Sequence, residues 1–326
     1  MRRACLPLAS HPAKPPPMKL ITKGDALPGP LRGGIVALGN FDGFHAGHQA
    51  VVGAARDWAR KLGRPALVAS FDPHPARLFQ PDVPPFALST IAQRERWLGN
   101  FGMDGLVMIP FSRELAALSA EEFVDEWLEM RLGVAGVVTG GDFTFGKSRS
   151  GDVTELARLG LKKGFAARVV DPVADKAGTI SSTRIRAALR AGQPGLAGDM
   201  LTRPFTIVGT VEHGAKLGRT LGFPTANLTL GDYVRPAYGV YAVRVWLGDG
   251  TRVDGVANLG IRPMIEPPVE LLETWLMDWS GDLYGQTIGV ELVAYLRPEM
   301  KLPGLDALKA QIARDAEDAK RVLRGG

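Results

Sequence analysis

Short apolar runs alternate with helical stretches from Gly34 to about Arg190, and this alternation constrains the fold more than any other feature of the chain. Strands and helices that follow one another in this way form a parallel sheet with helices on both faces. Ligands on such sheets bind beyond the carboxyl ends of the strands. The predicted strands, all expected to be buried, are Ile35–Leu38, Ala66–Phe71, Leu106–Ile109, Gly136–Thr139 and Ala167–Val170. The predicted helices are 48–62, 91–100, 120–132 and 152–163.

The third of these helices has a start signal of its own. Ser119 is a suitable N-cap, Glu122 follows three residues later, and Phe123 and Trp127 fall on one helical face. This arrangement is typical of a capping box ahead of an amphipathic helix.

After Gly192 the pattern changes. Gly192–Gly195 and the residues that follow read as a connection, and beyond them apolar and polar residues alternate between turns rich in Gly, Asp and Pro. Short strands at this spacing predict a barrel or a sandwich. The predicted strands are Phe205–Val211, Tyr238–Trp246, Val253–Leu259, Leu271–Trp279 and Ile288–Leu296, and a charged helix is predicted over Leu305–Leu323.

Length and composition agree with two globular domains. A chain of 326 residues is too long for one ordinary core. Its single cysteine, Cys5, excludes a disulfide framework and indicates a reducing compartment. No apolar run is long enough to cross a membrane. We therefore expect a soluble, cytoplasmic protein with a disordered tail over residues 1–17, interrupted by prolines and without a signal-peptide core.

The net charge leaves three interpretations open. The formal charge is +5 and the pI is near 9.4, which raises nucleic acid as a partner. The basic residues are scattered, however, and no basic helix or aromatic RNA-binding pattern accompanies them. Phosphate-bearing ligands, or an ordinary solvated surface, account for the charge equally well.

A glycine- and histidine-rich loop follows the first predicted strand and leads into a helix. Free N–H groups and the helix dipole favour anions at such a position. His45 and His48, one helical turn apart, are expected to project to one side, where two imidazoles can stabilise charge on a phosphate. The other candidate nucleotide-binding residues of the loop are Gly39, Phe41, Asp42 and Gly43.

Two other interpretations of the histidines stay open. The pair can bind zinc with His74 or Asp42 as further ligands, although no Cys-rich or His-Glu-x-x-His pattern is present. Alternatively, one of the two histidines caps the loop. His74 itself lies between prolines in Phe71–Pro75, where it faces the same sheet edge or belongs to a rigid turn.

Gly141–Ser148 matches the letter of the P-loop pattern. Phe143 and Phe145 are too bulky for a loop that wraps phosphates, and the first strand already has its own glycine-rich loop. We expect the two rings to pack against the sheet or a ligand and Asp142 to point towards the nucleotide.

Ile180–Arg186 begins the last helix of the first domain. Ser182 and Thr183 at the helix start, with Arg184 and Arg186 one turn further, suit a triphosphate. A hydroxyl residue that serves only as an N-cap is the common alternative, although it leaves the two arginines unexplained.

The second domain carries a glycine-rich segment from His213 to Asn227. It predicts a loop that closes over phosphates, with candidate binding residues Gly214, Lys216, Gly218, Gly222 and Pro224. Thr225 and Asn227 offer neutral oxygens for Mg²⁺ bound together with phosphates. The alternative is an ordinary turn.

A kinase that acts on an alcohol benefits from a base beside the hydroxyl. Glu273 and Trp275 are predicted to share one face of a strand, so Glu273 is the candidate base. A surface glutamate on an exposed strand is the alternative.

The order of motifs in the first half resembles that of bacterial bifunctional riboflavin kinase/FAD synthetases. The motifs are GNFDGFHAGH, FDPHP, GGDFTFG and ISSTRIR. The resemblance implies a Rossmann-like nucleotidylyltransferase domain in which His45 and His48 hold the ATP α-phosphate. It also implies that Asp142 lies in the nucleotide site, and that Ser182, Thr183 and Arg186 hold the outer phosphates.

The second half resembles the riboflavin kinase module of the same family. GFPTAN, AYGVYAV, GVANLGIRP and SGDLYG carry this similarity. It implies a six-stranded barrel, Thr225 and Asn227 at the magnesium-nucleotide, and Glu273 as the activator of the ribityl hydroxyl. Met264 and Trp275 depart from the usual threonine and histidine, and Ile265–Pro268 lacks the usual glycine-containing loop.

The combined prediction is an enzyme that phosphorylates riboflavin to FMN and adenylylates FMN to FAD, with ATP and Mg²⁺. The predicted divisions are a tail over 1–17, an FMN adenylyltransferase domain over 18–200 and a riboflavin kinase domain over 201–326. We expect a monomer or weak homo-oligomer that binds no nucleic acid and no membrane. The alternatives are an adenylyltransferase with an impaired kinase domain and a flavin-binding protein without catalysis.

Overall fold

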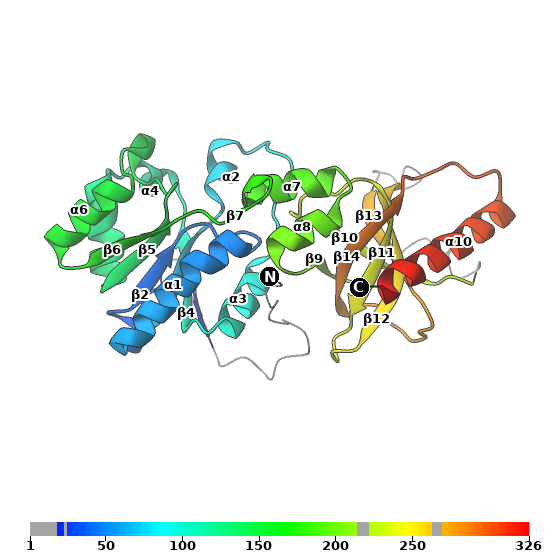
Figure 1. Cartoon of the computed structure of the whole chain (residues 1–326), viewed down its shortest axis with the longest axis horizontal. Helices are drawn as coiled ribbons and strands as arrows, with labels where there is room; N and C mark the ends of the chain where they lie inside the picture. The colour runs from blue at the N-terminus through cyan, green and yellow to red at the C-terminus, as the bar shows by residue number, and fades with distance from the viewer. Residues whose placement is uncertain (1–17, 23–24, 214–221, 263–268, 326) are drawn as a thin grey trace. The chain divides into compact units, whose positions relative to one another are not determined.

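The computed structural model describes residues 18–22, 25–213, 222–262 and 269–325. Among these residues the chain forms two compact units (Figure 1). The first holds the described residues before Pro84 together with Thr90–Ser181, and the second holds Pro84–Ser89 and the residues from Ser182 onward.

The first unit contains a six-stranded sheet in which every pairing is parallel. The strand order is β1-β4-β3-β2-β5-β6. The sheet confirms the predicted α/β class and all five predicted strands, and it adds β1, which was not predicted. The strands are β1 (Lys19–Ile21), β2 (Ile35–Leu38), β3 (Ala66–Asp72), β4 (Gly105–Pro110), β5 (Gly136–Gly140) and β6 (Ala166–Val170).

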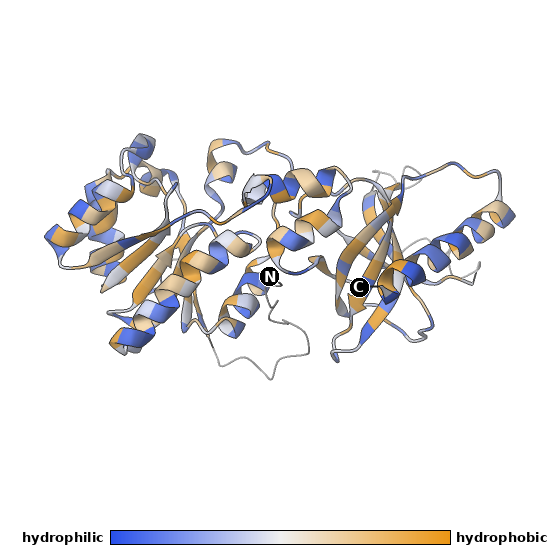
Figure 2. Ribbon diagram, viewed as in Figure 1, coloured by the Kyte–Doolittle hydropathy of each residue, from blue (hydrophilic) through white to orange (hydrophobic). Residues whose placement is uncertain are grey.

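Helices cover both faces of this sheet because two apolar clusters lie on opposite sides of it. Helices α1 (Ala46–Leu62) and α3 (Ile91–Asn100) contribute to one cluster. The other cluster takes residues from α4 (Arg113–Ala117), α5 (Ala120–Phe123), η2 (Val124–Arg131) and α6 (Val153–Lys163). The central strands β2, β3, β4 and β5 are mostly apolar, as expected for a sheet buried on both faces (Figure 2). The short elements of this unit are η1 (Gly29–Leu31), α2 (Pro75–Phe79), η3 (Lys147–Arg149), β7 (Ala174–Asp175) and β8 (Gly178–Thr179).

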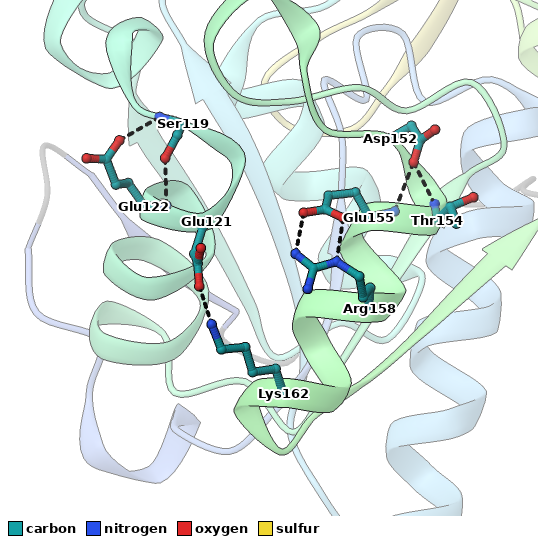
Figure 3. Close-up of polar contacts among 8 residues, drawn as sticks. All are labelled: Ser119, Glu121, Glu122, Asp152, Thr154, Glu155, Arg158 and Lys162. Carbon is teal, nitrogen blue, oxygen red and sulfur yellow. Dashed lines mark hydrogen bonds and ion pairs between the residues drawn. The ribbon is translucent and has the colours of Figure 1, made fainter.

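Side-chain caps fix the starts of α5 and α6 (Figure 3). The Ser119 side chain accepts from the backbone N–H of Glu122, and the Glu122 carboxylate accepts from Ser119 N at 2.7 Å, which confirms the predicted capping box. In α6, Asp152 Oδ1 accepts from the backbone N–H groups of Thr154 and Glu155, each at 2.9 Å. These bonds satisfy donors that have no partner inside the helix.

Two expectations about the first unit are wrong in detail. β6 is not buried, because it is the last strand of the sheet and most of its residues are exposed or half-buried. The predicted helix over 120–132 is α-helical only as far as Phe123 and continues as a π-helix through Arg131. Phe123 and Trp127 are both buried, so the predicted apolar face exists despite the change of helix type.

The second unit begins with α7 (Ser182–Arg190) and α8 (Pro194–Leu201). The prediction of a plain connection after Gly192 is wrong, because Pro194 sits at the first turn of α8, where its missing N–H costs nothing. Pro84–Ser89 joins this unit through Ala87, whose N–H donates to Asp232 O at 2.9 Å and whose carbonyl accepts from Val234 N at 2.8 Å.

A six-stranded antiparallel sheet follows, in the order β10-β13-β12-β11-β14-β9. Its two edges meet where Glu212 N donates to Asn227 O at 2.9 Å, which gives the predicted barrel. The strands are β9 (Phe205–Thr210), β10 (Thr225–Thr229), β11 (Gly239–Trp246), β12 (Arg252–Arg262), β13 (Val269–Leu276) and β14 (Thr287–Arg297). Only β10 was not located beforehand.

The closing helix α10 (Leu305–Arg324) packs on the outside of the barrel. Ala316, Ala319 and Leu323 form a buried cluster with apolar residues of β11 and β12. Asp315 of α10 accepts two hydrogen bonds from Arg297 of β14, at 2.8 and 2.6 Å. The helix is therefore attached through both apolar packing and a buried ion pair.

Candidate functional site

The two histidines after β2 lie together at the start of α1. Their rings stack with centroids 3.6 Å apart and an interplanar angle of 22°. His45 is the N-cap of α1, and its Nδ1 accepts from the backbone N–H of His48 at 3.4 Å. The expectation that both project to one side is confirmed, and the capping alternative also holds for His45.

This cap decides which nitrogen of a neutral His45 carries the proton. Because Nδ1 accepts a hydrogen bond, a neutral His45 carries its proton on Nε2, which is therefore a donor. His45 is only 5% exposed. A buried donor at a helix N-terminus suits an anionic oxygen.

The loop ahead of α1 is held in an unusual conformation. Phe41 and Phe44 have positive φ angles of 48° and 42°, which side-chain-bearing residues rarely adopt. Both rings are buried, and they belong to the core cluster beneath α1. Their packing therefore stabilises a strained loop, as at many ligand sites. The predicted residues Gly39, Asp42 and Gly43 lie in this loop, with the Asp42 side chain buried.

Arg94 of α3 hydrogen-bonds to the backbone of this loop, a contact that the sequence does not predict. Its Nη1 lies 3.3 Å from both Asn40 O and Ser70 Oγ, and Ser70 Oγ donates to the same carbonyl at 2.8 Å. Burial lowers the pKa of Arg94, whereas the carboxylates of Asp42 and Asp72 raise it. A buried guanidinium near two carboxylates thus fixes the backbone at Asn40.

Two polar atoms in this support remain unsatisfied. Asn40 Oδ1 and Arg94 Nε are buried and have no hydrogen-bond partner among the residues that the structure describes. Buried polar atoms without partners are rare and require an explanation. No local pattern in the sequence marks Arg94, because Gln93, Glu95 and Arg96 beside it are also polar and its partners Asn40 and Ser70 lie on other elements.

The two phenylalanine rings of the P-loop-like segment Gly141–Ser148 pack against the core, as expected. Phe143 and Phe145 stack with centroids 5.7 Å apart and pack against the cluster on the α5 and α6 face. Lys147 begins only the short 3-10 turn η3, and its N–H donates to Leu118 O. A P-loop requires a longer helix at this point. Asp142 is exposed.

The remaining candidates of the first half have other local roles as well. His74 caps α2, with Nδ1 accepting from Ala76 N at 3.2 Å. Ser182 begins α7, which belongs to the second compact unit, as do Thr183 and Arg186. Arg186 Nε donates to Phe86 O at 2.7 Å, and its guanidinium lies over the Phe86 ring.

The barrel brings together residues that are far apart in the sequence. Asn227 of β10 is the direct cross-strand partner of Glu273 on β13, and Thr225 is the partner of Trp275. On the other side of β13, Asn258 of β12 is also the partner of Glu273. Residues opposite one another in an antiparallel pair share a face. The predicted metal ligands and the predicted base are therefore neighbours.

This row lies on the outer face of the barrel, the side on which α10 packs against β11, β12 and β14. Trp275 packs against the α10 cluster, and alternation along β13 places Glu273 on the same side. The intervening Thr274 is fully buried in the barrel interior. Glu273 and Trp275 thus share one face, as predicted. Gly222 and Pro224 precede β10 and are exposed, and the Phe223 ring lies edge-on to Trp275 at a centroid distance of 4.8 Å.

The predicted flap residues Gly214, Lys216 and Gly218 lie outside the described residues, as do Met264 and the segment 265–268. Among the described residues, Asn227 Oδ1 is buried without a hydrogen-bond partner. A neutral oxygen of this kind fits Mg²⁺ that is bound together with phosphates. No group of three or more His, Cys, Asp or Glu side chains in the described part of the chain is placed to hold a metal.

The fold and these sites define a class of protein: an α/β nucleotidyl-transfer domain joined to a β-barrel of the kinase type. Residues 28–184 match the family model for FAD synthetase, and residues 201–323 match that for riboflavin kinase. The chain belongs to the family of bifunctional riboflavin kinase/FMN adenylyltransferases.

Relatives and a solved structure support this assignment. The bifunctional riboflavin kinase/FMN adenylyltransferase of Escherichia coli (strain K12) is 41% identical over 89% of this chain and 93% of its own length. The enzyme of the same name from Bacillus subtilis (strain 168) is 36% identical over 88% of this chain and 92% of its own length.

A crystal structure from Streptococcus pneumoniae titled a macrolide-efflux protein matches with a TM-score of 0.83 and 32% identity, and covers 93% of this chain and 98% of that one. In the described part of the present chain, no helix combines the length and apolar character that crossing a membrane requires.

Proposed function

We propose that the barrel transfers the γ-phosphoryl group of ATP to the terminal hydroxyl of riboflavin, and that the α/β unit then transfers AMP to FMN. The first reaction gives FMN and ADP, and the second gives FAD and pyrophosphate. The observation that carries the first reaction is the pairing of Asn227 with Glu273 across β10 and β13, and the second rests on the stacked rings of His45 and His48.

In the barrel, this pairing supports a role for Asn227 as a ligand of Mg²⁺ and a role for Glu273 as the base. Glu273 accepts the proton of the riboflavin hydroxyl as its oxygen attacks the γ-phosphorus. Thr225 and Asn227 hold Mg²⁺, which neutralises charge on the ATP phosphates. The strand register supports these roles, because Asn227 lies directly opposite Glu273 and Thr225 lies two residues along β10, opposite Trp275.

In the α/β unit, the stacked histidines take the place of a base. Nε2 of His45 donates to an oxygen of the ATP α-phosphate, and His48 lies against His45 on the same side of the helix. The FMN phosphate attacks that phosphorus and pyrophosphate leaves. Positioning and charge stabilisation account for such a reaction without a covalent intermediate. Asp142 is proposed to contact the nucleotide. Ser182, Thr183 and Arg186, which belong to the second compact unit, are proposed to bind phosphate.

The test is to incubate the protein with riboflavin, ATP and Mg²⁺, and to separate the flavins by chromatography. FMN is expected first and FAD later, with one ADP per FMN and one pyrophosphate per FAD formed. Removal of Mg²⁺ with EDTA stops both reactions. If supplied FMN becomes FAD but riboflavin is unchanged, the kinase half of the proposal is wrong. If no flavin is converted, the whole proposal is wrong.

A further inference from the structure

The residue on the other side of Glu273 has no assigned role, although its environment is as specific as that of Asn227. Asn258 is the cross-strand partner of Glu273 on β12, as Asn227 is on β10. The three side chains therefore form one row on the outer face of the barrel. Any group bound beside Glu273 is within reach of either amide.

The orientation of the Asn258 amide is fixed from one side. Its Nδ2 donates to Glu299 Oε1 at 3.1 Å. Gly260, two residues further along the same face, lets that carboxylate approach, because a Cβ at Gly260 would lie 2.2 Å from Glu299 Oε1. Since the Nδ2 group points to Glu299, the Oδ1 atom must be directed elsewhere.

Asn258 Oδ1 is the atom that this arrangement leaves unsatisfied. It is buried and has no hydrogen-bond partner among the described residues. A buried acceptor without a partner destabilises the protein unless a bound group supplies the donor. We propose that Asn258 Oδ1 accepts a hydrogen bond from a hydroxyl of the riboflavin ribityl chain, next to the terminal hydroxyl that Glu273 activates.

Two observations favour a hydroxyl donor over a cation. Asn227 and Asn258 are separated by β13, so their backbones lie roughly 10 Å apart. Two ligands of one Mg²⁺ bring their oxygens within about 4 Å of each other. The ribityl chain, by contrast, carries hydroxyls on neighbouring carbons, so a chain that ends at Glu273 presents its next hydroxyl to an adjacent strand. This inference rests on the proposed kinase activity.

The first experiment replaces the amide with an apolar group of similar size, Asn258→Leu. We expect the KM for riboflavin in the kinase reaction to rise about tenfold, the effect of losing one hydrogen bond. The KM for ATP should not change. The Ki of lumiflavin, a flavin without a ribityl chain, as a competitive inhibitor of the kinase should also stay constant. Conversion of supplied FMN to FAD reports that the other unit is intact.

Thr274→Val is the matched control. Thr274 neighbours Glu273 on β13, and its Oγ1 is likewise buried without a hydrogen-bond partner among the described residues, but it faces the barrel interior. Its removal should leave the KM for riboflavin unchanged.

A second pair of variants tests the inference even if the Asn258→Leu variant does not fold. Asn258→Asp keeps an acceptor at Oδ1 but sets a carboxylate against Glu299, so the KM for riboflavin should rise. Adding Glu299→Gln restores a donor–acceptor contact between the two side chains and should lower the KM again.

Three results would overturn the inference. The first is a rise in the KM for ATP or in the Mg²⁺ requirement in place of that for riboflavin, which would make Asn258 a nucleotide or metal ligand. The second is a lumiflavin Ki that rises in step with the riboflavin KM. The third is an unchanged riboflavin KM in Asn258→Leu. If the unaltered protein phosphorylates no riboflavin, the proposed function itself fails, which the same assay shows separately.

Discussion

The two candidate sites are built in different ways. In the α/β unit, His45 and His48 come from one loop and one helix start, and a cap and ring stacking hold them. In the barrel, Asn227, Asn258 and Glu273 come from three strands, and only the register of those strands makes them neighbours.

The two sites differ in the interactions that hold their side chains in position. A local site needs its own loop conformation, which the buried rings of Phe41 and Phe44 and the guanidinium of Arg94 stabilise. A site assembled from strands needs the whole barrel, including α10. Substitutions near the histidines should therefore affect one reaction, whereas substitutions that loosen the barrel should affect its site without any direct contact.

The largest expected effect separates the two sites. His48→Ala should lower conversion of FMN to FAD by about 100- to 1,000-fold, because a group that stabilises phosphate charge is lost. FMN should then accumulate from riboflavin. Chromatography of the flavins checks this result, and equal loss of both products would show that the sites are not independent.

Glu273→Gln tests the barrel in the same way. The variant removes the base but keeps the size of the side chain, and we expect riboflavin phosphorylation to fall about 100-fold. Conversion of supplied FMN to FAD should continue at its usual rate. A kinase rate close to that of the unaltered protein would exclude Glu273 as the base.

Asp315→Ala tests the dependence of the barrel on α10. Asp315 is 3% exposed and pairs with Arg297, so its removal leaves a buried charge without its partner. We expect a loss of about 3 kcal/mol in the free energy of unfolding of the barrel. Thermal denaturation should show a lower Tm, while the FMN adenylylation rate at low temperature stays constant. A parallel loss of adenylylation would contradict separate stability of the units.

Arg94→Met tests the support beneath the histidine loop. The substitution removes the contacts to Asn40 O and Ser70 Oγ but retains much of the apolar stem. We expect the kcat of FMN adenylylation to fall about tenfold, in line with a misplaced loop. Riboflavin phosphorylation measured in the same sample is the control, and an unchanged adenylylation rate would show that Arg94 does not position the loop.

Glu291→Gln should have the smallest effect, at a barrel position away from the row. Burial raises the pKa of Glu291, while Trp246 Nε1 donates to it at 2.6 Å. Because the folded pKa is raised, the protonated form is favoured on folding, and this contribution is lost as pH rises through the folded pKa. Glutamine keeps the acceptor, so stability should increase at neutral pH by less than about 0.5 kcal/mol. Urea denaturation at pH 4 and pH 7 checks that the gain disappears in acid.

Much of the fold followed from local patterns. The capping box at Ser119, the mostly apolar central strands and the helix after His48 each depend on residues a few positions apart, so the sequence was sufficient to locate them. The exposed strand β6 and the helix α8 were misread. An apolar run does not reveal whether its strand lies at a sheet edge, and Gly195 beside Pro194 obscured a helix whose stability comes from packing.

Resemblance supplied the residue types of the barrel site but not their arrangement. The GFPTAN motif was read as a loop motif, whereas Thr225–Thr229 is the strand β10. Asn258 received no role, because nothing in GVANLGIRP by itself indicates that its asparagine faces Glu273. Arg94 was missed for the same reason, since Asn40 and Ser70 lie on other elements.

The amino-acid sequence alone determined the alternation of strands and helices, the change of architecture after Gly192 and the pairing of His45 with His48. The tertiary structure decided which position each strand takes in its sheet. It also decided which side chains lie opposite one another on β10, β13 and β12. The physical reason is range: caps and helix periodicity act over a few residues. Strand register and burial depend on the packing of segments that the chain brings together only when it folds.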